Sequence, residues 1–229
     1  GILVLPLVIT FLLFPGQAHS QELDMPGTGV WNGFNRHINV AECSSASEKE
    51  IKVEIVVRGN QGQNLGAPVS FILPPHGTRH VVLNEFPIAD SYGTYLVKSN
   101  SPEASRLSCL TAIYKMAAPG SGKAVEYAFA LPVQNPLRGE TAGVYNSMDP
   151  ALSTQPVFNW LSVYNPGDTI FNGAVELYAA NGALDSEKSF GITRLLPGER
   201  RDFALGHEEG QVVGIYRIVP DDEFQAYGA

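Results

Sequence analysis

An outline that occurs twice, at a nearly constant spacing, constrains the fold of this chain more than any other feature. The tripeptide "VEI" at 53–55 matches "VEL" at 175–177 at an offset of 122 residues, and the same offset aligns Pro75 with Pro197. Solenoid and propeller repeats are shorter, about 20–50 residues. The spacing therefore predicts two tandem domains that arose by duplication. Chance convergence of two similar patterns of turns and strands is the alternative.

Within each copy, apolar and polar residues alternate over short runs. The segment "IKVEIVV" (51–57) places Ile51, Val53 and Ile55 on one face, and "GAVELYA" (173–179) follows the same pattern. Gly, Pro, Asn and Asp interrupt these runs, and the 23 glycines and 16 prolines supply many turns. One turn contains Asn-Gly at 181–182, the preferred dipeptide of a two-residue hairpin. We therefore expect an all-β, antiparallel fold.

The same patterns predict the domain boundaries. We expect the first domain at 28–132, closed by an extra hairpin made of "SCLTAIYKM" and "AVEYAFALP". The segment 133–156 has little alternation and three prolines, so it is expected to be a linker. The second domain is expected at 157–229 and to be truncated, because the sequence stops inside a strand-like run.

The first 20 residues, "GILVLPLVITFLLFPGQAHS", have the features of a secretory signal peptide. The apolar run from Ile2 to Phe14 has 13 residues, whereas a membrane-spanning helix needs about 20. Ala18 and Ser20 supply the small residues required before a cut at Gln21. We predict export to the periplasm or the cell surface, with no membrane insertion after cleavage. A buried core helix is the alternative.

The chain has two cysteines, Cys43 and Cys109, both in the first copy. An oxidising compartment permits a disulfide between them. The chain-entropy model assigns a bridge of this loop length about 4 kcal/mol. Two unpaired, buried thiols are the alternative.

Two motifs resemble phosphate-binding or catalytic motifs, but each lacks residues that the chemistry requires. The loop "APGSGKA" (118–124) resembles a phosphate-binding loop, but Ala117 replaces its first glycine and Ala124 replaces the hydroxyl residue after the lysine. We interpret it as a flexible hairpin tip. In "GHEEG" (206–210), His207 adjoins two carboxylates, but the sequence marks no nucleophile, so a solvated loop is expected. No catalytic residue and no cofactor are predicted.

Metal sites are not expected either. His76 and His80 would share a face with Arg79 between them, and His37 would supply a third zinc ligand. The second copy, however, has Gly198 and Asp202 in place of the first two histidines. The acidic loops "NPGD" (165–168) and "PDDE" (220–223) lack the oxygen spacing of a dedicated calcium loop.

The two tryptophans are candidate stacking platforms for sugars. Trp160 falls in an alternating strand, so we expect it to pack in a core. Trp31 lies in a glycine-rich segment, and both a buried and an exposed position are open for it.

The segments "NWLSVYNPGDTIFNGAVELYAANGAL" and "LLPGERRDFAL" resemble the tandem immunoglobulin-like β-sandwich repeats of exported bacterial surface proteins. Those repeats share an N-W-x-x-V-x-N strand, a D/N-G hairpin and a P-G turn. The resemblance covers most of 30–115 and 157–229, but the first copy departs from it, with Arg36-His37 where the second has Asn159-Trp160. It implies adhesion, spacing or display, and no catalytic set.

The net charge of −8 argues against nucleic-acid and anionic-membrane partners. We therefore predict a non-catalytic structural, adhesive or display module of an exported bacterial envelope protein, with an unknown protein or glycan at the cell surface as its partner. One alternative is a pair of accessory domains of an exported enzyme whose catalytic part lies outside this sequence. Another is a carbohydrate-binding module, which an exposed row of aromatic residues on a sheet face would favour.

Overall fold

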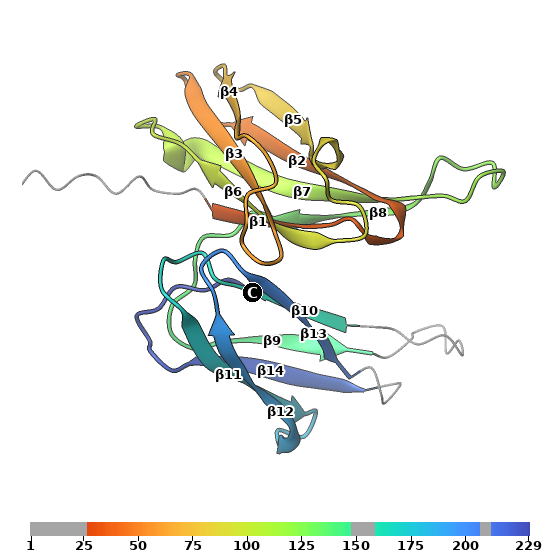
Figure 1. Ribbon diagram of the computed structural model, residues 1–229, viewed down its shortest axis with the longest axis vertical. Coiled ribbons are helices and arrows are strands. Elements are labelled where there is room, and N and C mark those ends of the chain that lie inside the picture. Colours follow the sequence, from red (N-terminus) through yellow and green to blue (C-terminus); the bar gives the residue numbers. More distant parts are fainter. Residues whose placement is uncertain (1–26, 148–158, 207–211) are drawn as a thin grey trace, which may run out of the picture.

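The computed structural model describes residues 27–147, 159–206 and 212–229 and is all-β, as predicted (Figure 1). In these residues every regular element is a strand or a single 3-10 turn, and every pairing of named strands is antiparallel. The predicted signal peptide, residues 1–20, lies outside them. The strands are β1 (Gly27–Asn32), β2 (His37–Ser45), β3 (Ile51–Gly59), β4 (Val69–Leu73), β5 (Thr78–Val82), β6 (Tyr92–Lys98), β7 (Leu107–Met116), β8 (Val125–Pro132), β9 (Thr141–Asn146), β10 (Asn159–Tyr164), β11 (Phe171–Ala179), β12 (Leu184–Leu195), β13 (Arg200–Leu205) and β14 (Val213–Pro220).

Strands β1 to β8 form the first sandwich. One sheet has the order β1-β6-β3-β4 and the other the order β5-β2-β7-β8. The apolar residues of β3 alternate as predicted, and its inward positions, including Ile55, pack with Trp31 and Tyr95 against Ala41 and Val81 of the second sheet. The predicted extra hairpin is confirmed, because β7 pairs with β8 along its length.

Strands β9 to β14 form the second sandwich, with a core of its own. Its sheets have the orders β12-β11-β14-β9 and β10-β13. Read from β9, the larger sheet repeats the β1-β6-β3-β4 order of the first sandwich, and the pair β13-β10 repeats β5-β2. Strands β7 and β8 have no counterpart in the described part of the second sandwich.

Strand β9 lies inside the 133–156 segment that was expected to be a linker. It pairs with β14 along its whole length and is the outer strand of the larger sheet. Its alternation is weak in sequence because Gly143 occupies the middle, where the Tyr216 ring fills the place of a side chain. Val144, the apolar residue beside it, points to solvent. Residues 148–156 of the expected linker lie outside the described part of the chain.

The disulfide between Cys43 and Cys109 is confirmed. The two residues lie directly opposite each other in β2 and β7, with their Cα atoms 4.2 Å apart. The bridge therefore joins neighbouring strands of one sheet, and it encloses the chain that forms β3 to β6.

Candidate functional site

The structure separates the three histidines that were considered as zinc ligands. His37 is buried and contacts the Tyr127 hydroxyl at 3.1 Å, whereas His76 contacts the Glu48 carboxylate at 3.2 Å on the surface. His80 lies 4.0 Å from Glu42. No group of three His, Cys, Asp or Glu side chains in the described ranges is arranged to hold a metal ion.

Two of the other sequence motifs fall in turns. The 118–124 segment is the tip between β7 and β8, where Gly120 and Gly122 adopt positive φ and a Cβ on either would meet no other group within 4 Å. In the 220–223 loop, the Asp222 carboxylate accepts a hydrogen bond from the Phe224 amide at 2.9 Å. His207 lies outside the described residues.

The structure decides the position of Trp31, which the sequence left open, and contradicts the expectation for Trp160. Trp31 is fully buried, and its indole N–H lies 3.0 Å from the backbone oxygens of both Arg58 and Thr94. Trp160 was expected in a core, but it is 62 % exposed. The expectation for Trp160 was wrong because Leu161 and Val163 are the core positions of β10, so Trp160 leaves the sheet on the opposite face.

That opposite face of β10 and β13 contacts the first sandwich through Arg200, which is 5 % exposed. The Arg200 guanidinium binds Asp202 through two hydrogen bonds of 2.8 Å and donates to the Ser162 hydroxyl at 2.9 Å. It also donates across the junction to the backbone oxygens of Trp31 and Gly93, at 2.9 and 2.7 Å. All five donors of this side chain are used.

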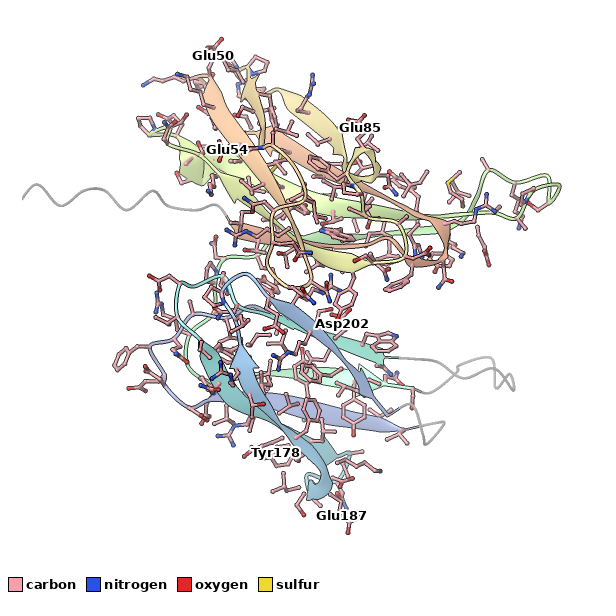
Figure 2. All side chains as sticks on the ribbon, in the orientation of Figure 1. Glu50, Glu54, Glu85, Tyr178, Glu187 and Asp202 are labelled. Atoms are coloured by element: carbon pink, nitrogen blue, oxygen red, sulfur yellow. A yellow bond between two sulfur atoms is a disulfide. The ribbon has the colours of Figure 1, made fainter. Side chains whose placement is uncertain are left out.

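The backbone extends the same junction. The turn before β13 reaches the loop after β3, where Glu199 forms a β-bridge with Gln61 and the Arg200 amide donates to the Asn60 oxygen at 2.8 Å. Burial in this region raises the pKa of Tyr164 to about 12, while the nearby charge of Arg200 opposes that rise. Figure 2 labels Asp202 at this junction, on the side of the second sandwich that faces the first.

Sequence reasoning missed Arg200, although a signal was present. In the run "RRDFAL", alternation places Arg200 and Asp202 on one face of the strand and Arg201 with Phe203 on the other. A matched charge pair on the face opposite the core indicates an ion pair within the strand, and such a pair is usually exposed to solvent. The sequence does not reveal that its remaining donors reach another domain.

A second feature is an apolar row on β8, the outer strand of its sheet. Every residue of β8 is exposed. Phe129 lies opposite Ile113 of β7, so both side chains leave the sheet on the same face, yet Phe129 is 46 % exposed and Ile113 only 3 %. This face is therefore covered at β7 and open to solvent at β8. The β8 row consists of Val125, Tyr127, Phe129 and Leu131.

The β8 row runs toward the second sandwich. Leu131 and Trp160 line one cavity of about 200 Å³, which also contacts Thr28 of β1 and Tyr164 of β10. Near the other end, the Tyr127 and Phe129 rings stack with their centroids 6.3 Å apart. Exposed apolar side chains of both sandwiches, Leu131 and Trp160, thus line this cavity together.

Scans against protein-family models, curated proteins and solved structures find no match to this chain. The residues that the structure describes contain no helix long and apolar enough to cross a membrane. The class that the fold itself defines is an all-β protein of antiparallel sheets packed as two sandwiches, with one disulfide in the first.

Proposed function

We propose that this chain is a non-catalytic structural, adhesive or display module of an exported bacterial envelope protein, built from two tandem immunoglobulin-like sandwiches. The β8 row carries the proposal. Exposed, contiguous apolar surface marks interaction sites, and an outer strand offers unpaired backbone groups to a partner. The Cys43–Cys109 disulfide suits an oxidising, extracytoplasmic compartment.

The junction supports the mechanical part of this function. Arg200 binds backbone oxygens of the first sandwich and the side chain of Asp202 in the second, so it opposes rotation between them. A partner would therefore meet the β8 row and Trp160 in a constant relative position. Rigid presentation lowers the entropy lost on binding, which favours adhesion.

The test is attachment of cells of the organism that encodes the chain. Deletion of the gene is expected to reduce attachment, and the wild-type gene is expected to restore it. A Tyr127→Ser/Phe129→Ser variant should fail to restore it, because the β8 row loses both rings. The matched control is Val144→Ser/Ile215→Ser, which removes an exposed apolar pair from the second sandwich. Full restoration by the Tyr127/Phe129 variant would contradict the proposal.

A carbohydrate-binding module is a second candidate, favoured by the stacked rings of Tyr127 and Phe129 and the exposure of Trp160. Aromatic faces of this kind also stack on sugar rings. Co-sedimentation of the purified protein with insoluble polysaccharides separates the two candidates. Sedimentation that depends on Tyr127 and Phe129 would support glycan binding, whereas attachment of cells without any polysaccharide binding would support a protein partner.

A further inference from the structure

A cleft of about 760 Å³ lies between the two sandwiches and is separate from the β8 row. Its first wall is the outer face of β3 and β6, which contributes Arg58, Leu96 and Lys98. Its second wall consists of loops of the second sandwich, including Asp168 and Phe224. The volume falls within the range of small-molecule sites, about 300–1,000 Å³.

Arg58 in this cleft has no charged partner among the residues that the structure describes. Its Nε is buried from solvent and has no hydrogen-bond partner among the residues that the structure describes. Desolvation of the half-buried side chain lowers its pKa, and no neighbouring charge counteracts this effect. Arg200, in contrast, uses all five donors. A partly desolvated, unpaired arginine lowers the stability of the folded protein.

The position of Arg58 is set from both sandwiches. The Trp31 indole N–H binds the Arg58 backbone oxygen, which anchors the end of β3. On the other side, a Cβ at Gly198 would lie 3.0 Å from Arg58 Nη1, so the Pro197-Gly198 turn abuts the guanidinium. Two other cations of the cleft are engaged: Lys98 lies 3.8 Å from Glu54, and Arg138 donates to the Phe224 oxygen. Arg58 is therefore the group available for a ligand.

We propose that the cleft binds a small ligand through one carboxylate group, held by the Arg58 guanidinium. An arginine fork matches both carboxylate and phosphate. Asp168 and Asp222 line the same cleft, and their negative charges disfavour a doubly charged phosphate more than a singly charged carboxylate. Apolar side chains, among them Phe171 and Phe224, would contact the body of the ligand.

The test is calorimetric titration of the purified two-sandwich protein with three probes: N-acetyl-L-phenylalanine, D-glucuronate and inorganic phosphate, with D-glucose as the neutral control. We expect at least one of the two carboxylates to bind more tightly than phosphate, and no heat from glucose. The tighter carboxylate identifies the source as a peptide carboxyl terminus or an acidic sugar. Tighter binding of phosphate, or no binding of either carboxylate, would overturn the proposal.

Two variants connect the binding to Arg58. Arg58→Met is expected to weaken carboxylate binding at least about tenfold, because a charge-assisted bidentate contact is lost. Arg79→Met, on the exposed strand β5, makes the same change in net charge and should leave the affinity unchanged. Equal affinity of wild type and Arg58→Met would contradict the assignment.

A second measurement distinguishes a binding role from a structural one. Without ligand, the thermal midpoint of Arg58→Met should be equal to or higher than that of the wild type, because the variant removes an unpaired, desolvated cation. A lower midpoint would show that Arg58 stabilises the fold, and it would overturn the argument that the side chain is kept for a ligand.

Discussion

At the scale of single residues, the Pro-Gly turn of the second sandwich shows how one position serves both local and long-range structure. Gly198 adopts φ +76° in a turn closed by the Glu199 amide and the Leu196 oxygen. The offset of 122 places His76 at the same position of the first copy, and His76 also has positive φ, 54°. His76 is exposed, so only backbone strain limits the residue there, whereas Gly198 contacts the other sandwich.

We predict that Gly198→Ala destabilises the protein more than Gly182→Ala does. Both glycines have positive φ, which costs an L-residue about 1–2 kcal/mol. A Cβ at 182 meets no atom within 4 Å, but one at 198 lies 3.1 Å from Gly62 Cα, and overpacking adds about 1–3 kcal/mol. Urea unfolding of both variants measures the difference. Equal losses of stability would mean that the 198 turn moves without cost.

At the scale of elements, β7 and β8 distinguish the first sandwich from the second. Strand β7 carries the disulfide partner of β2, and β8 extends the sheet beyond the cover of the facing sheet. The hairpin therefore contributes both a covalent tie and the exposed β8 row. The second sandwich has no disulfide, since both cysteines lie in the first.

The disulfide should stabilise the first sandwich alone. We expect Cys43→Ala/Cys109→Ala to lower its free energy of unfolding by about 2–5 kcal/mol, because the bridge restricts the unfolded chain between β2 and β7. In a Trp160→Phe background, fluorescence reports only Trp31, which lies in the first core. A loss below about 1 kcal/mol would contradict this expectation.

At the scale of the whole molecule, the junction determines whether two sandwiches behave as one body. Their cores are separate, so the relation between them depends on few contacts. Arg200 supplies the buried ones, together with the backbone bridge at Gln61 and Glu199. The cleft with Arg58 and the cavity lined by Leu131 and Trp160 both exist only while this junction is closed.

Arg200→Met is therefore expected to separate the sandwiches. It breaks the contacts to Trp31 and Gly93 and leaves Asp202 without its partner, a change that costs about 3–5 kcal/mol for a buried pair. Small-angle X-ray scattering should show a larger radius of gyration, and protease should cut faster near 133–140.

The matched control is Arg201→Met. Arg201 binds Glu199 and the backbone oxygens of Thr193 and Arg194, all in its own sandwich. This variant should keep the wild-type scattering profile. The same radius of gyration in both variants would show that Arg200 does not hold the junction.

Much of the fold follows from short-range pattern. Alternation in "IKVEIVV" and "GAVELYA", turn residues at regular intervals and the 122-residue offset predict antiparallel strands in two similar units, because side chains of a strand alternate between faces whatever lies beyond them. The cysteine pairing was predictable as one of two alternatives. The pattern fails at Gly143, where the Tyr216 ring replaces a missing side chain, so the sequence indicates a linker where β9 lies.

The sequence by itself therefore determined most of the strands, the turns and the two similar units. Only the tertiary structure decided the burial of Trp31, the exposure of Trp160, the partners of Arg200 and the burial of the Arg58 Nε without a hydrogen bond from a described residue. The physical reason is that backbone oxygens more than 100 residues away satisfy Arg200 across the junction. Local periodicity has no information on which surface of one sandwich meets the other, and that contact creates both the junction and the cleft.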